Sequence, residues 1–369
     1  MPGAPIDYRS AGVDYQQIDA LKVQAQQAAR ATARHLAGHG VHELERSRGE
    51  SAYVMEVGGR LLASVTECLG TKALVADATR PISGRTHYDS IAQDTIAMAV
   101  NDLLTVGATP LAVQAYWAAG SSEWFADAER MRDLIAGWQA ACEQCRVSWG
   151  GGETPALNGV VAPERIDLAA SCLGVIEPRE RLLLGEQLAP GDAIVLFGSS
   201  GIHANGVTLA RRVAERLAAG YGARLEDGRR FGEALLDPTI LYASVMERFW
   251  AGGGRAHYCV NITGHGWRKL MRHPQSLTYR ISLLPPVPAV LRFLQREAAL
   301  DDHEAYGSLN MGAGFALFVP PDQAGAALSA ARAAQVPAWV AGHVEPGPRR
   351  VVIEPLRLSY DAHELELRA

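Results

Sequence analysis

Apolar residues recur in two patterns along the chain, which predicts interleaved helices and strands. Helical spacing covers residues 14–36, 90–106 and 121–145. Short apolar runs predict strands at 53–57, 61–66, 111–117, 147–149 and 166–176. Because Gly58-Gly59 separates the first two runs, those strands are expected to form a hairpin.

A polar segment with Pro and Gly residues, 177–190, interrupts this pattern. It predicts two domains, 1–178 and 179–369. The second half predicts strands at 193–197, 315–319 and 338–343, and helices starting near 205 and after 263, and at 234–250, 287–297 and 323–334. Interleaved helices and strands indicate an α/β or α+β class.

Composition narrows the class of protein. The 369 residues carry 35 Lys and Arg against 40 Asp and Glu, a net charge of −5, which argues against non-specific nucleic-acid binding. No apolar stretch is long enough to span a membrane. Five cysteines are too few for a disulfide scaffold. With no signal-like N-terminal pattern, these features predict a cytoplasmic protein without nucleic-acid or membrane partners.

The cysteine pair Cys142-x-x-Cys145 resembles a redox motif or half of a zinc site. Both cysteines fall on the apolar stripe of the helix predicted at 121–145, and the sequence has no second pair. We therefore predict that both thiols belong to the hydrophobic core.

Polar residues on the helix at 90–106 form the first candidate site. Asp94 and Asn101 are seven residues apart, nearly two turns, and Asp102 lies close to the same face. Oxygen ligands of this kind suit Mg²⁺ held together with substrate phosphates. The alternative is a helix cap at Asp89 followed by a solvated face.

Several glycine-rich segments lie at predicted strand ends. Backbone N–H groups in such loops bind phosphate, although each segment taken alone also suits a plain turn. The segments are 67–72, 150–154, 198–206, 261–266 and 310–314. Together with the clustered carboxylates, they indicate a phosphorylated ligand with Mg²⁺.

In order along the chain, these motifs resemble the aminoimidazole ribonucleotide (AIR) synthase family, also called phosphoribosylformylglycinamidine cyclo-ligase. The matching stretches are 8–14, 70–72, 94–110, 151–154, 167–169, 198–206, 237–239, 262–264 and 310–312. The resemblance implies an N-terminal α/β domain, whose strands pair with a second copy in a homodimer-spanning barrel, and a C-terminal α+β domain.

The resemblance also implies ATP and Mg²⁺ as cofactors and a small-molecule substrate. The γ-phosphoryl group activates an amide or carboxyl oxygen, a nitrogen nucleophile attacks, and ADP and phosphate leave. The implied Mg²⁺ ligands are Glu67, Asp94 and Asp102, and the implied catalytic residues are Lys72, His203 and Asn205. The implied cofactor-binding residues are Gly70, Thr71, Asn101, Gly151, Gly152, Glu153, Ser200, Gly201, Thr263 and Gly264.

Several positions depart from the family pattern. Glu67 replaces an aspartate, Asn261 replaces a histidine, and His265 replaces a glycine. The acids that handle nucleotide and metal remain, whereas substrate-facing positions differ. We therefore expect an active ATP-dependent enzyme whose acceptor lies outside purine synthesis. The alternatives are a genuine cyclo-ligase of purine synthesis and a non-catalytic nucleotide-binding protein.

Overall fold

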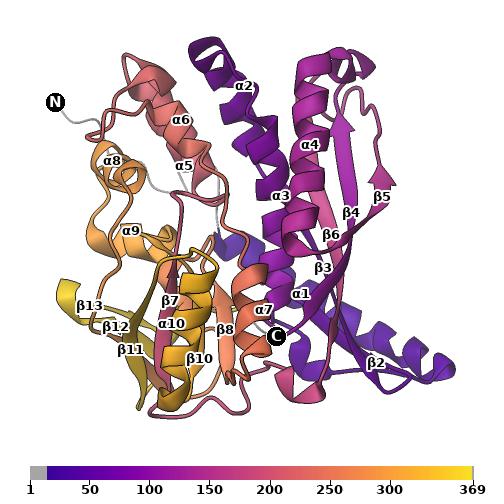
Figure 1. Ribbon diagram of the computed structural model, residues 1–369, viewed down its shortest axis with the longest axis vertical. Helices are drawn as coiled ribbons and strands as arrows, with labels where there is room; N and C mark the ends of the chain where they lie inside the picture. The colour runs from indigo at the N-terminus through magenta and orange to yellow at the C-terminus, as the bar shows by residue number, and fades with distance from the viewer. Residues whose placement is uncertain (1–14, 368–369) are drawn as a thin grey trace.

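The protein, described here from a computed structural model over residues 15–367, has two α/β lobes packed side by side (Figure 1). The first lobe is built on a six-stranded sheet in the order β1-β2-β3-β6-β4-β5. Its strands are β1 (Val41–Glu43), β2 (Tyr53–Val57), β3 (Arg60–Cys68), β4 (Thr109–Ala119), β5 (Ser148–Glu153) and β6 (Ile166–Ile176). Its helices are α1 (Tyr15–Thr32), α2 (Lys72–Ser83), α3 (Tyr88–Leu104) and α4 (Ala128–Cys145).

The predicted hairpin is confirmed, because β2 and β3 pair antiparallel from Tyr53 opposite Ser64 to Val57 opposite Arg60. Gly58 and Gly59 both have positive φ, which the tight turn requires. Helix α3 packs against β3 and β6, and α4 lies beside it, so these two helices cover one face of the sheet. On the other face, Leu111 and Leu173 are 45% and 39% exposed.

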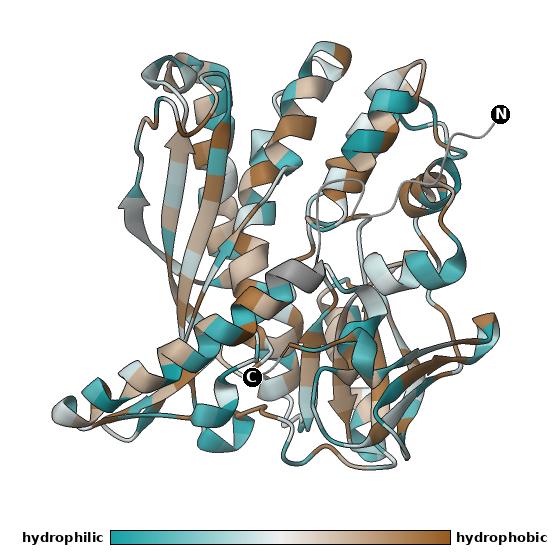
Figure 2. Cartoon of the chain, turned by 180° about the vertical axis from the view of Figure 1, so that it is seen from behind, coloured by the Kyte–Doolittle hydropathy of each residue, from teal (hydrophilic) through white to brown (hydrophobic). Residues whose placement is uncertain are grey.

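The second lobe contains a seven-stranded sheet in the order β13-β12-β9-β11-β7-β10-β8. Its strands are β7 (Ala193–Gly198), β8 (Tyr258–Asn261), β9 (Leu277–Ile281), β10 (Ala313–Val319), β11 (Ala338–Pro346), β12 (Arg350–Ile353) and β13 (Leu358–Asp361). Its helices are α5 (Val207–Arg216), α6 (Phe231–Leu235), α7 (Ala243–Ala251), α8 (Ala289–Ala298), α9 (Asp302–Ser308) and α10 (Ala324–Ala333). Every residue of β7 and β10 is buried, and Figure 2 shows the hydrophobic character of this sheet.

Two predicted helices differ from the structure. The helix expected over 234–250 is divided into α6 and α7, because Pro238 lacks the N–H that a continuous helix needs. The helix expected after Thr263 is a short 3₁₀ helix, η6 (Gly266–Met271). The break before α7 lies at the junction of the two lobes, where residues 239–242 form hydrogen bonds with α3.

Other expectations agree with the described residues. Cys142 and Cys145 are buried on α4, as the core prediction requires. Helix α1 occupies most of the predicted 14–36 segment, and the matched stretch 8–14 lies outside the described residues. Between residues 15 and 367, no helix is long and apolar enough to cross a bilayer.

Candidate functional site

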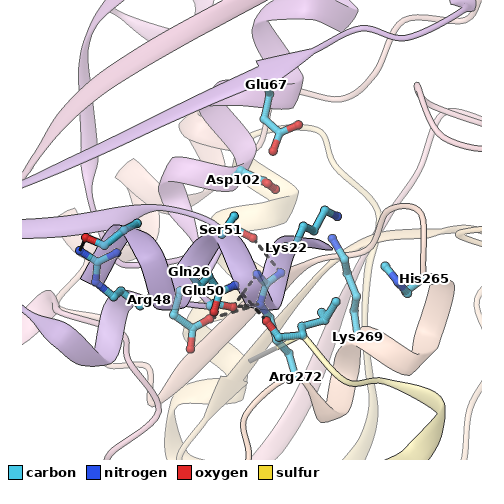
Figure 3. A pocket seen from close by; sticks show the side chains of 14 residues that line it. Lys22, Gln26, Arg48, Glu50, Ser51, Glu67, Asp102, His265, Lys269 and Arg272 are labelled. Carbon is cyan, nitrogen blue, oxygen red and sulfur yellow. Dashed lines mark hydrogen bonds and ion pairs between the residues drawn. The ribbon is translucent and has the colours of Figure 1, made fainter. Parts of the chain in front are cut away.

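A charged cavity of about 450 Å³ lies where the two lobes meet, which is the size of a small-molecule site. Helix α1, the end of β3, the last turns of α3 and the 3₁₀ helix η6 all contribute to it. Its charged or titratable lining residues are Lys22, Arg48, Glu50, Glu67, Asp102, His265, Lys269 and Arg272. Figure 3 shows that Glu67 and Asp102 lie together, apart from Lys22, Lys269 and Arg272.

The acidic side of the cavity is formed by Glu67 and Asp102. Burial, and after it the neighbouring Asp102 carboxylate, raise the pKa of Glu67 to about 8. The Asn261 side-chain amide donates to Asp102 Oδ1 at 2.7 Å. A bound cation would reduce the repulsion between these two neighbouring, desolvated carboxyl groups.

The basic side is formed by side chains from three separate segments. Lys269 of η6 is only 7% exposed, and this burial lowers its pKa to about 8. Its ammonium group donates to the Thr263 hydroxyl. Arg272 pairs with Glu50 at 3.4 Å and donates to the Gly49 carbonyl at 2.8 Å, which fixes its guanidinium at the cavity wall. The cavity therefore presents acids and cations to one ligand, a combination that suits a metal-bound anion.

Asp94 does not join this cavity. Its Oδ2 lies 2.7 Å from Lys72 Nζ, and both side chains are fully buried. The backbone N–H and hydroxyl of Thr239 donate to its Oδ1 at 2.7 and 2.5 Å. The structure thus brings Glu67 and Asp102 together but places Asp94 elsewhere. Asp94 and Asp102 are eight residues apart on α3, which corresponds to about 12 Å along the helix axis.

Asp94 belongs instead to an interdomain clamp, which we define as Gln93, Asp94 and Asn101 of α3 bound to residues 239–242. The Asn101 amide donates to the Ile240 carbonyl at 2.8 Å, and its oxygen accepts from the Tyr242 N–H at 3.0 Å. Gln93 donates to the Thr239 carbonyl at 2.8 Å. The alternative of a solvated face is wrong for Asp94 and Asn101, which are buried. In this structure, both polar atoms of the Asn101 amide group form hydrogen bonds with backbone groups of the second lobe.

Lys72 also faces the clamp, not the cavity. Besides pairing with Asp94, its ammonium donates to the Asp237 carbonyl at 3.1 Å. Just before it, the Thr71 and Thr208 hydroxyls are 3.3 Å apart, which links α2 to α5. Gly70 adopts a φ of +73°, as the tight turn into α2 requires. These contacts tie the 70–72 motif to the second lobe.

The 198–206 loop is tied to the same region. His203 has a φ of +58°, and its Nε2 accepts from the Ser200 N–H at 3.2 Å. Burial, and after it the charge of Lys72, lower the pKa of His203 to about 3, so the imidazole is neutral. Ser200 donates to the Pro238 carbonyl at 2.6 Å, and the Gly201 carbonyl accepts from Asn310 at 2.8 Å. Asn205 lies against Met98, with its amide 3.7 Å from the sulfur.

Gly151, Gly152 and Glu153 lie in β5, an exposed edge strand, where the sequence predicted a loop. Gly152 pairs with Ala115 of β4, and an added Cβ would come within 2.1 Å of the Ala115 carbonyl oxygen. Close approach of two strands therefore explains this glycine. None of these three residues lines the cavity. Thr263 holds Lys269, and Gly264 is the next residue of the same turn.

The sequence patterns did not identify the cationic residues of the cavity as candidate site residues. Lys22, Lys269 and Arg272 match no motif, and no spacing links the N-terminal helix to residue 269. Their only sequence signal is the position of Lys269 five residues after the predicted Thr263-Gly264 anion site.

Known proteins resemble this chain in sequence over most of its length. Phosphoribosylformylglycinamidine cyclo-ligase from Sorangium cellulosum is 35% identical over 349 residues, covering 92% of this chain and 95% of the relative. The protein of the same name from Anaeromyxobacter sp. is 33% identical over 371 residues, covering 95% and 99%.

Solved structures with low identity share the fold. One is a hydrogenase maturation protein HypE in complex with ATP (TM-score 0.57, 19% identity), which covers 83% of this chain and 85% of its own. Another is AaThiL complexed with AMPPCP and TMP (TM-score 0.56, 15% identity), which covers 85% and 90%. These likenesses support the two-domain fold expected from the resemblance.

Family models match both lobes. Residues 49–176 match the AIR synthase related protein, N-terminal domain, and residues 189–354 match the corresponding C-terminal domain. Together these matches cover most of the chain, and residues of both matched domains line the charged cavity together with residues of α1, which lies outside them. The chain belongs to the AIR synthase related family.

Proposed function

We propose that this protein is an ATP-dependent cyclo-ligase acting on formylglycinamidine ribonucleotide. The main support for this function is the cavity, in which the Glu67 and Asp102 carboxyl groups face a group of cationic side chains. Relatives named phosphoribosylformylglycinamidine cyclo-ligase, matched over nearly the full chain, favour this reaction over the acceptor outside purine synthesis that the departures suggested.

Glu67 and Asp102 in the cavity are the residues that could hold Mg²⁺. Within residues 15–367, no group of three His, Cys, Asp or Glu side chains is arranged to hold a metal. Mg²⁺ commonly uses one or two carboxylates, with substrate phosphates and water completing its shell. Glu67 and Asp102 fit that role, whereas Asp94 does not, because Lys72 and Thr239 occupy its oxygens. Bound there, the ion would neutralise phosphate charge.

The chain's own residues supply positioning and charge. Lys22, Lys269 and Arg272 would face the phosphate groups, which lowers the repulsion between two anionic substrates. The γ-phosphoryl group moves to the amide oxygen and ADP leaves. The amine nitrogen then forms the new C–N bond, the C–O bond breaks, and phosphate and a proton are released. An amide oxygen is a poor leaving group until it is phosphorylated, so the protein has mainly to align the reactants.

A coupled assay tests this function. We expect ADP release that requires both ATP and formylglycinamidine ribonucleotide, with one ring-closed product per ADP detected by mass spectrometry. ATP without acceptor is the control for background hydrolysis. Binding of ATP without turnover would favour the non-catalytic alternative. ADP release only with other amides or carboxylates would restore the alternative of an acceptor outside purine synthesis.

We also propose that the open face of the first sheet forms a homodimer. Strands β3, β4 and β6 line a hollow of about 330 Å³ on this face, with Val65, Leu173 and several small polar residues at the surface. Leu111 and Leu173 are among the most exposed large apolar residues of the described chain. An apolar face of this kind, on a sheet whose other face is covered, is a candidate for association with a second copy.

Light scattering tests the dimer. The expected mass is about twice the 39.5 kDa of one chain. Leu173→Arg should shift the protein to a single-chain mass, because it places a charge in the apolar face. Leu283→Arg is a matched control, since Leu283 is exposed to a similar extent, 42% against 39% for Leu173, but belongs to the second lobe. A single-chain mass for the unmodified protein would contradict the proposal.

A further inference from the structure

Helix α1 forms one wall of the charged cavity. Lys22, Ala25, Gln26 and Ala29 line it from this helix, and Figure 3 shows Lys22 beside Lys269. The other cationic side chains of the cavity lie outside α1. The position of Lys22 therefore depends on whatever holds α1 against the second lobe.

The strongest described contact that holds α1 there is a hydrogen bond between Asp19 and His265. His265 Nε2 lies 3.0 Å from Asp19 Oδ2, and the side chains are 8% and 17% exposed. His265 is in the turn just before η6, four residues from Lys269. A hydrogen bond to a charged group that is shielded from water contributes more than an exposed ion pair.

Two other polar contacts of α1 are more exposed or longer. Arg30 pairs with Glu45 at 3.1 Å, but their side chains are 51% and 62% exposed. Gln26 donates to the Leu367 carbonyl at 3.2 Å. Exposed ion pairs contribute little, whereas the Asp19–His265 contact is largely shielded from water and ties α1 directly to the turn before η6.

Asp19 and Lys22 are one helical turn apart, with Asp19 Oδ1 3.5 Å from Lys22 Nζ. Because the two residues lie on the same side of α1, holding Asp19 in place keeps Lys22 directed toward the cavity. We propose that His265 is a positioning residue, which holds α1 through Asp19 so that Lys22 completes a cationic wall with Lys269 for an anionic group of the substrate. The identity of that substrate rests on the proposed function, whereas the attachment of α1 does not.

Paired substitutions at residue 265 test the attachment. Glutamine places an N–H at nearly the distance from the backbone that His Nε2 has, whereas asparagine is one bond shorter. Trypsin cleavage after Lys22 and Arg30, followed by mass spectrometry, reports how often α1 leaves its place. We expect H265N and D19A to be cleaved about tenfold faster than the unmodified protein, and H265Q to resemble it.

Kinetics test the role of Lys22. H265N, D19A and K22M should raise the KM for the anionic substrate about tenfold with kcat unchanged, and H265Q should restore the original KM. Arg34→Met is the control, because Arg34 is a neighbouring cation that does not line the cavity.

Equal cleavage of H265N and the unmodified protein would overturn the attachment, even if no turnover were found with formylglycinamidine ribonucleotide. Faster cleavage with an unchanged KM would overturn the role of Lys22. Faster cleavage of H265N but not H265Q, in a protein without cyclo-ligase activity, would support the attachment and reject only the proposed function.

Discussion

Asp94→Ala is expected to lower the free energy of unfolding by about 3–5 kcal/mol, the cost of leaving a buried charge without its partner. Lys72 is fully buried, and Asp94 is the described carboxylate within 4.0 Å of its ammonium group. The substitution also removes the acceptor for both the N–H and the hydroxyl of Thr239. Urea denaturation followed by tryptophan fluorescence and by circular dichroism would measure the loss.

Two controls isolate the buried pair. Asp89→Ala removes a half-exposed acid from the first turn of the same helix and should change the free energy of unfolding by no more than about 0.5 kcal/mol. The double variant Lys72→Met/Asp94→Leu should recover part of the loss, because no unpaired charge remains. An Asp94→Ala variant as stable as the Asp89→Ala variant would show that the contacts of Asp94 with Lys72 and Thr239 do not stabilise the fold.

Asp102→Asn is expected to lower kcat/KM for ATP-dependent turnover by about 100- to 1000-fold, the scale of losing one preorganised charge at a reacting centre. The substituted side chain keeps an oxygen that can accept from the Asn261 amide, so the local hydrogen bond survives while the negative charge is lost. The Mg²⁺ concentration for half-maximal rate should rise as well. Initial rates at varied Mg²⁺ would measure both effects.

Glu67→Gln should produce a loss in the same direction, because Glu67 shares the acidic side of the cavity with Asp102. Asp89→Asn, at an exposed position of α3, should leave the rate unchanged. If the kcat/KM of Asp102→Asn stayed within about threefold of that of the unmodified protein, Glu67 and Asp102 would not form the metal-binding site.

Much of the fold was predictable from local pattern. The β2–β3 hairpin follows from two apolar runs around Gly58-Gly59, and the buried α4 cysteines follow from a helical stripe. Collinear motifs over most of the chain indicated the family. Glu67, Asp94 and Asp102 were expected together as metal ligands, Asp102 from a matched motif and Glu67 as a departure from the family pattern. The structure places Glu67 and Asp102, but not Asp94, in one cavity.

The sequence by itself determined the alternation of helices and strands and the family, because these depend on near neighbours or on motif order. The roles of Glu67, Asp94 and Asp102 as metal ligands were predicted from the resemblance, and for Glu67 and Asp102 they stay predictions. Only the tertiary structure decided that Asp94 and Asn101 hold the two lobes together and that Lys22 and Lys269 share a cavity. Helical spacing shows which side of α3 a residue occupies, but not what packs against that side. Lys22 and Lys269 are far apart along the chain, and they meet because both lobes fold and pack on one another.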